Sequence, residues 1–257
     1  MSGRKPVVYP TDMVYIYDGT LAGFFTCVYE SVYQKQMPLA IIFGEEEQFS
    51  LFRRREIETD QIKAKKVYDS IPVKISKRAL DLIETVFFSC LEDKELIMLE
   101  FLLRGYGIGA SITKMMGDPL VSTLLKADRH LKGEAHLLLG FIRFSDADGF
   151  LTSTISPKNF ILPFIANHFV SRYREENFVI YDKIHQAVLV YQDGKTEILK
   201  VDHIVFPEVT EEEGNYQALW KQFYKTISIE SRKNPRCRMT HMPKRYWENM
   251  LEVQELL

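Results

Sequence analysis

Residues 177–201, NFVIYDKIHQAVLVYQDGKTEILKV, decide the fold class of the chain. They contain three short runs rich in Val, Ile, Leu and Tyr: NFVIYD, QAVLVYQDG and TEILKV. Turn-forming residues separate the runs, at Lys183-Ile184-His185 and at Asp193-Gly194. Apolar runs of this length that are bounded by tight turns are typical of neighbouring antiparallel strands. The sequence therefore predicts an antiparallel β-meander in the C-terminal half.

The segments on either side of the meander are predicted to form further strands and helices of the C-terminal half. Residues 136–157, HLLLGFIRFSDADGFLTSTISP, alternate well enough for two strands joined by the turn DADG. Residues 158–173 favour a helix or a proline-interrupted helix. After the meander, the spacing predicts a helix around Asn215 to Arg232, and a last helix follows Pro243. The apolar face of the first of these two helices comprises Tyr216, Leu219, Trp220, Phe223, Tyr224 and Ile227.

The N-terminal half is mainly helical by the same criteria. A short strand at Met13 to Tyr17 precedes an amphipathic helix that stops before Pro38. Three further helices are predicted: one after the N-cap Ser76, one over Lys94 to Arg104, and one from Asp118-Pro119 to just before Gly133.

Helices and strands are thus segregated rather than alternating as βαβ units, which favours an α+β fold. We expect a helical N-terminal half, and an antiparallel β-meander with flanking helices in the C-terminal half. Residues 1–257 are expected to form a single α+β domain with a soft boundary near residue 133.

Composition limits the classes of function. The net charge is -2, so any phosphate binding must come from local clusters of cations. Cys27, Cys90 and Cys237 lie far apart, which argues against a disulfide framework and a structural metal site, and we expect no cofactor. The first residues lack the apolar core of a signal peptide, and the longest apolar runs are too short or too interrupted to cross a bilayer, so we expect a cytoplasmic protein that does not contact membranes.

The strongest local cluster of cations is residues 231–247, SRKNPRCRMTHMPKRYW, which contains six Lys or Arg and no carboxylate. Cations at the end of the preceding helix complement its dipole, and Trp247 is expected to anchor the last helix to the core. Lys244 and Arg245 would instead lie in the first turn of the last helix, where a phosphate would stabilise them. We therefore predict a nucleic-acid-binding surface made of Arg232, Lys233, Arg236, Arg238, His241, Lys244, Arg245 and Tyr246.

Candidate acid/base residues are few. Asp18 follows a strand, where a helix cap is the more common role. Glu134 and His136 would share one side of an extended segment and could form an acid/base pair, although such a pair is common without function. His168 lies in an apolar helical stretch, which is typical of a core residue. Glu134, His136 and His168 could ligate a metal, but their spacing is not diagnostic of a metal site.

Three segments together resemble a bacterial family described as DNA-metabolism proteins: YDGTLAGFFTCVYE (17–30), EAHLLLGFIRF (134–144) and NPRCRMTHMPKRYW (234–247). The resemblance extends from about Val14 to Glu252. Members of that family are encoded beside a radical-SAM protein of DNA modification or repair, and some are fused to a uracil-DNA-glycosylase-like domain. This chain ends soon after the third segment, so we expect that extension to be absent.

The resemblance implies a context in DNA metabolism, with no assigned catalytic residue to transfer. It directs attention to Tyr17, Asp18 and Gly19, to Glu134, His136, Gly140, Phe141, Arg143 and Phe144, and to Asn234, Pro235, Arg236, His241, Met242, Pro243, Arg245, Tyr246 and Trp247.

Three hypotheses follow from these observations. The first is an accessory protein of DNA repair or modification that contacts DNA through the C-terminal cluster and works with a radical-SAM partner. In that case the substitutions Arg236→Ala, Arg238→Ala and Arg245→Ala each flatten the salt dependence of binding by about one unit. The second is an enzyme acting on DNA or a nucleotide, with Asp18 or Glu134/His136 as acid/base groups. The third is a protein-interaction scaffold.

Overall fold

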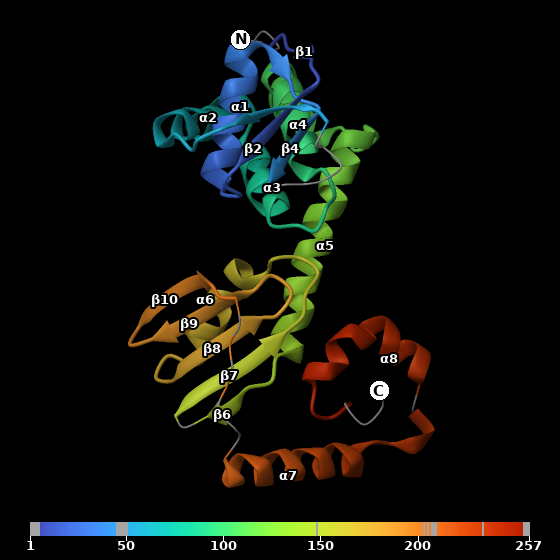
Figure 1. Cartoon of the computed structure of the whole chain (residues 1–257). Coiled ribbons are helices and arrows are strands. Elements are labelled where there is room, and N and C mark those ends of the chain that lie inside the picture. The colour runs from blue at the N-terminus through green and yellow to red at the C-terminus, as the bar shows by residue number, and fades with distance from the viewer. Residues whose placement is uncertain are drawn as a thin grey trace. The chain divides into compact units, whose positions relative to one another are not determined.

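The computed structural model describes residues 6–44, 51–147, 149–202, 204, 206, 210–232 (without the side chain of residue 230) and 234–253. The chain forms two compact units, Met1–Leu131 and Lys132–Leu257 (Figure 1). The division falls within helix α5 (Pro119–Phe141). The organisation of the chain as a single domain stays a prediction.

The first unit contains a three-stranded parallel sheet. Its strand order is β4-β2-β5, formed by β4 (Ala40–Phe43), β2 (Met13–Tyr17) and β5 (Arg53–Glu56). The predicted strand MVYIY is confirmed as β2. Helix α1 (Leu21–Gln34) connects β2 to the parallel strand β4, which makes a βαβ unit. Two short strands, β1 (Tyr9–Pro10) and β3 (Gln36–Met37), pair beside it.

The first unit also contains α2 (Gln61–Lys74), α3 (Lys77–Phe87), α4 (Lys94–Ile108), the 3₁₀-helix η2 (Gly109–Lys114) and the first part of α5. Ser76 caps α3 as predicted, because its hydroxyl accepts a hydrogen bond from the N–H of Ala79 at 3.1 Å. Their apolar faces form one core, whose fully buried residues include Phe24, Ile71, Leu80, Ile83, Met98, Leu99, Phe101 and Leu102.

Within the described residues, one helical segment is long and apolar enough to cross a membrane by length and composition alone. It covers Lys94–Lys114, with a mean hydropathy of 1.3. Met98, Leu99 and Phe101 of this segment are buried in the core of the first unit. These residues pack in the core of the first unit, and the cytoplasmic location stays a prediction.

The second unit contains a five-stranded sheet of order β10-β9-β8-β7-β6. Its strands are β6 (Ser145–Ala147), β7 (Phe150–Ile155), β8 (Asn177–Asp182), β9 (Ala187–Gln192) and β10 (Lys195–Lys200). The predicted meander is confirmed, because β8–β9 and β9–β10 pair antiparallel. The β6–β7 hairpin is antiparallel too.

Strands β7 and β8 pair in parallel, because α6 (Leu162–Arg172) carries the chain between them and packs on β9 and β10 (Figure 1). The expectation that strands and helices do not alternate as βαβ units is therefore wrong at two places, β2–α1–β4 and β7–α6–β8. The α+β fold class is confirmed: a helical N-terminal region accompanies a C-terminal sheet of mostly antiparallel strands.

Helix α5 starts at the predicted Asp118-Pro119 pair, where the Asp118 carboxylate accepts the N–H of Leu120 at 2.9 Å. The predicted end before Gly133 is wrong, since the helix continues to Phe141. Buried residues recur at helical spacing through the glycine, at Ala127, Leu131, Ala135 and Leu138. Residues 136–141 therefore belong to a helix and not to a strand.

The C-terminal segment is built from α7 (Glu211–Ile227), the 3₁₀-helix η3 (Glu230–Arg232), α8 (Pro235–His241) and the 3₁₀-helix η4 (Lys244–Asn249). The predicted last helix is thus one short 3₁₀ segment. A helix of this length has little dipole, so the argument that Lys244 and Arg245 need a phosphate at its first turn fails.

Candidate nucleic-acid interface

Helix α8 carries three of the predicted nucleic-acid-binding residues. Asn234 caps it, because its side-chain oxygen accepts the N–H of Cys237 at 3.0 Å, and Pro235 follows at the first helical position. This local signal fixes the start of the helix, which places Arg236, Arg238 and His241 on its surface. Arg236 and His241 are exposed, and Arg238 is half-buried.

Two arginines of this segment converge on one cavity, which we call the basic hollow. It has a volume of about 390 Å³ and is lined by Ile227, Ser228, Ile229, Arg232, Asn234, Cys237 and Arg238. Among the described residues that line it, Arg232 and Arg238 are the charged ones, and neither forms an ion pair with a described residue. Ser228 and Asn234 add polar groups beside the two guanidinium groups. The basic hollow therefore presents positive charge that no described carboxylate neutralises.

The remaining cations of the cluster differ in their surroundings. Lys244 is exposed, and its ammonium lies 5.7 Å from the ring centroid of Trp247. The Trp247 ring is buried and its indole N–H donates to the Met242 carbonyl at 2.8 Å, so Trp247 anchors the segment as expected. Lys233 lies outside the described residues.

Arg245 and Tyr246 correct the predicted surface, because both point inward. Tyr246 is only 2% exposed, and its hydroxyl donates to Glu134 Oε1 at 2.6 Å. Arg245 Nη2 lies 3.2 Å from the same carboxylate oxygen and donates to the Tyr246 hydroxyl at 2.7 Å. Its guanidinium carbon is 4.7 Å from the centre of the Tyr246 ring. This arginine satisfies an internal carboxylate, and Tyr246 has no free face for a base.

Glu134 is the centre of this internal network. It is 3% exposed and also accepts the N–H groups of Lys158 at 3.0 Å and Asn159 at 2.8 Å, together with the Asn159 side-chain amide at 2.6 Å. Burial by itself raises the pKa of Glu134, but the hydrogen bonds from Lys158, Tyr246 and Asn159 outweigh it and hold the pKa below its ordinary value. A low-pKa carboxylate whose oxygens are all engaged is a structural anion and not a general base.

The proposed Glu134/His136 acid/base pair is wrong. Both residues lie on α5, where a separation of two residues turns them about 200° apart around the helix axis. Glu134 is buried, whereas His136 is exposed. His168 was expected in the core, but it is exposed on α6, with its ring 5.1 Å from that of Phe169. Among the described residues, no group of three or more potential metal ligands is present.

Asp18 lies in the first unit, in the turn that starts α1. Its Oδ1 accepts the N–H and hydroxyl of Thr20 at 2.9 and 2.7 Å, and its Oδ2 accepts the Thr59 hydroxyl at 2.6 Å. Partial burial raises the pKa of Asp18, but these hydrogen bonds exceed that effect and lower it. The N-cap itself is Thr20, whose hydroxyl accepts the N–H of Gly23 at 2.9 Å. Asp18 therefore positions Thr20, the N-cap residue of α1.

A second groove in the C-terminal unit was not predicted. It has a volume of about 580 Å³, and its lining brings Arg143 and Arg172 together with Phe144, Tyr173 and Trp220. No local sequence pattern predicts this groove, because its lining residues come from different helices and loops. Arg143 donates to Glu252 Oε1 at 2.6 Å, and the Trp220 indole approaches Glu252 Oε2 at 3.4 Å. Arg143 is thus held by a buried carboxylate, while Arg172 is exposed.

The apolar face predicted for α7 exists at the expected spacing but is not covered. No residue of α7 is buried in the part of the chain that the structure describes. Tyr216 is 61% exposed and Phe223 is 52% exposed, with Leu219 and Ile227 similarly open. A continuous exposed apolar face of this kind is typical of a protein-contact surface.

The chain was compared with models of protein families. A family model described as a domain of unknown function, DUF4130, matches residues 92–252. The matched region contains Glu134, the basic hollow and the groove at Arg143, and it starts after the Asp18 turn. No curated protein matches the chain.

Proposed function

The chain belongs to the DUF4130 family, and on that premise we propose that it is an accessory protein of DNA repair or modification that binds nucleic-acid phosphates at the basic hollow. The single observation that supports this proposal is the convergence of Arg232 and Arg238 on one cavity without a described carboxylate partner. Guanidinium groups bind phosphate oxygens in a bidentate manner, and backbone contacts of this kind dominate nucleic-acid affinity. Exposed Arg236 and Lys244 add further positive charge in this segment, and exposed His241 adds a hydrogen-bonding imidazole.

The test is the salt dependence of binding to fluorescently labelled single-stranded and double-stranded oligonucleotides. We expect the double variant Arg232→Ala/Arg238→Ala to reduce the slope of log affinity against log salt by about two units, because each arginine neutralises one phosphate. The matched control is Arg174→Ala, which removes an exposed arginine of the same unit outside the hollow. An unchanged slope in the double variant would contradict the proposal.

The exposed face of α7 supports a second part of the proposal, a protein partner. We propose that this partner is the radical-SAM protein implied by the family resemblance, which would supply the iron–sulfur chemistry. Replacing Leu219 and Phe223 by Ser removes much of the exposed apolar area without touching a buried residue, so the fold should be retained. The expected result is loss of co-elution of the two purified proteins in size-exclusion chromatography. Exposed Leu51→Ser, in the other unit, is the control. If the Ser variant still co-elutes, α7 is not the contact.

A further inference from the structure

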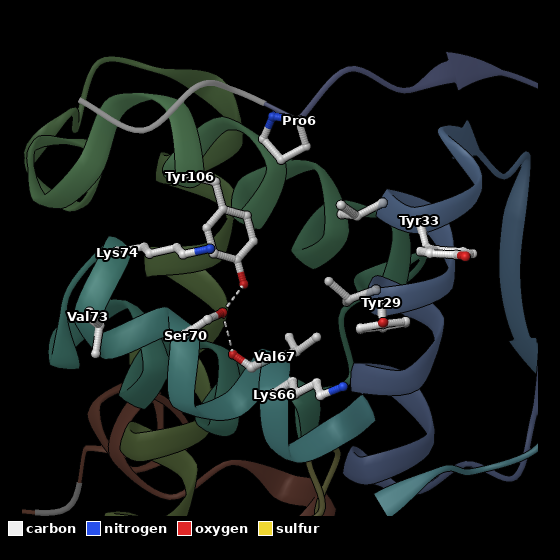
Figure 2. Close-up of a pocket in the computed structure, with 11 residues that line it drawn as sticks. Pro6, Tyr29, Tyr33, Lys66, Val67, Ser70, Val73, Lys74 and Tyr106 are labelled. Carbon is white, nitrogen blue, oxygen red and sulfur yellow. Dashed lines mark hydrogen bonds between the residues drawn. The ribbon is translucent and has the colours of Figure 1, made fainter. Parts of the chain in front are cut away.

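A separate pocket lies in the first unit, between helices α1 and α2, with Tyr106 of α4 on its third side (Figure 2). Its volume is about 620 Å³, which is within the range of small-molecule sites, about 300–1,000 Å³. It is lined by Pro6, Val28, Tyr29, Val32, Tyr33, Lys66, Val67, Ser70, Val73, Lys74 and Tyr106. Of these residues only Tyr106 lies within the DUF4130 match, so the pocket is independent of the proposed nucleic-acid surface.

The charged side chains in the described lining of the pocket are all positive. In the described part of the lining, Lys66 and Lys74 are the charged residues, and neither forms an ion pair with a described residue. Each ammonium instead lies near an aromatic ring, at 5.9 Å from the Tyr29 centroid for Lys66 and at 5.7 Å from the Tyr106 centroid for Lys74 (Figure 2). The neighbouring Lys65, by contrast, is paired with Asp69 on the outer side of α2. Two lysines without carboxylate partners make the pocket complementary to an anion.

Two hydroxyls of the lining, those of Ser70 and Tyr106, use their protons within the protein. The Ser70 hydroxyl donates its single proton to the Val67 carbonyl at 2.8 Å. In the 2.7 Å contact between Ser70 and Tyr106, the Tyr106 hydroxyl must therefore be the donor. Both protons are used inside the protein, so a ligand's anionic group would be held by the lysines and not by these hydroxyls.

The rest of the lining is apolar and aromatic. Val28, Val32 and Val67 supply aliphatic surface, and the rings of Tyr29 and Tyr33 are stacked at 13° with centroids 6.0 Å apart. An aromatic ligand gains ring–ring contacts at such a wall beyond the area that it buries. We propose that this pocket binds a planar aromatic molecule carrying one anionic group, a carboxylate or a phosphate monoester, with the ring against the wall formed by Tyr29 and Tyr33 and the anion at Lys66 and Lys74.

Isothermal titration with compounds of one ring system tests this inference on the full-length protein. The probes are 2-naphthoate and 2-naphthyl phosphate, with 2-naphthalenemethanol as the uncharged match and octanoate as the aliphatic anion. We expect both naphthyl anions to bind more tightly than the alcohol and octanoate, and the tighter of the two anions identifies the preferred group. The proposal fails if neither anion binds up to its solubility limit, if the alcohol binds equally well, or if octanoate binds better.

Variants then locate the site. Lys66→Ala and Lys74→Ala should each weaken naphthoate binding by about fivefold, the upper range for an exposed ion pair, and leave the alcohol unaffected. Val73→Glu introduces a carboxylate at an exposed lining position and should weaken the anions further without disturbing the core. Lys65→Ala is the matched control on the same helix and should bind like the wild type. Equal effects of Lys65→Ala and Lys66→Ala would place the anion elsewhere. None of these results depends on nucleic-acid binding at the basic hollow.

Discussion

Replacing Glu134 by Gln is expected to lower the free energy of unfolding of the second unit by about 3 kcal/mol at neutral pH. Each carboxylate oxygen accepts at least two donors: Oε1 from the Lys158 N–H and Tyr246, and Oε2 from both nitrogens of Asn159. Whichever oxygen becomes the amide nitrogen then faces two donors and loses both bonds. Arg245 also loses its counter-ion. Urea unfolding followed by tryptophan fluorescence, to which the buried Trp247 contributes, measures the change.

The pH dependence gives a second signature of the same variant. The folded-state pKa of Glu134 lies below its ordinary value, so the ionised carboxylate stabilises the fold fully above about pH 4.3, the unfolded pKa. This stabilisation is lost as the pH falls through the folded pKa. In Glu134→Gln that acid loss should be smaller than in the wild type. His136→Gln, an exposed position on the same helix, should leave both the stability and its pH dependence unchanged. A Gln variant with the wild-type acid profile would contradict the assignment of Glu134 as the central anion.

Replacing Arg143 by Met is the second large effect, with an expected loss of about 3 kcal/mol. The Glu252 side chain is 3% exposed, and Arg143 is its cationic partner at 2.6 Å. Without the guanidinium, the buried carboxylate keeps, among its contacts with described residues, only the long one from the Trp220 indole. The uncompensated charge, rather than the missing hydrogen bond, supplies most of this cost. The thermal unfolding midpoint and urea unfolding both report it.

A double variant separates this explanation from simple loss of packing. Adding Glu252→Gln to Arg143→Met removes the buried charge, so the double variant should be more stable than Arg143→Met alone. If the two substitutions instead destabilise additively, the pair does not act as a unit. Arg174→Ala is again the control for losing an exposed arginine.

Local sequence signals predict the helices and turns whose ends are formed by neighbouring residues. The caps at Ser76 and Asp118, and the turn at Asp193-Gly194, lie where the sequence indicates, because capping and turn formation involve neighbouring residues. The predicted end of helix α5 is too early because Gly133 resembles a helix stop. An isolated glycine costs about 1 kcal/mol in a helix, and the buried stripe on either side of Gly133 exceeds that cost.

The candidate site is only partly predictable for a different reason. The density of arginines in residues 231–247 is visible in the sequence, and Arg232 and Arg238 do face a hollow. Which arginine turns inward depends on a carboxylate far away in the chain, and no spacing rule identifies Glu134 as the partner of Arg245. The same holds for the Lys66 and Lys74 pocket, whose walls come from three separate helices.

The bond between Tyr246 and Glu134 joins residues that are 112 positions apart. During synthesis, the helix that bears Glu134 leaves the ribosome long before its tyrosine partner is made, and closing so long a loop is entropically slow. A nascent chain that has not reached residue 246 therefore lacks one hydrogen-bond donor of Glu134, although that carboxylate is buried in the folded unit. The β8–β9–β10 meander can assemble in that interval, whereas the final locking of the unit must wait for the tail. Translational pausing ahead of this segment would prolong the period in which the unit is vulnerable to proteases.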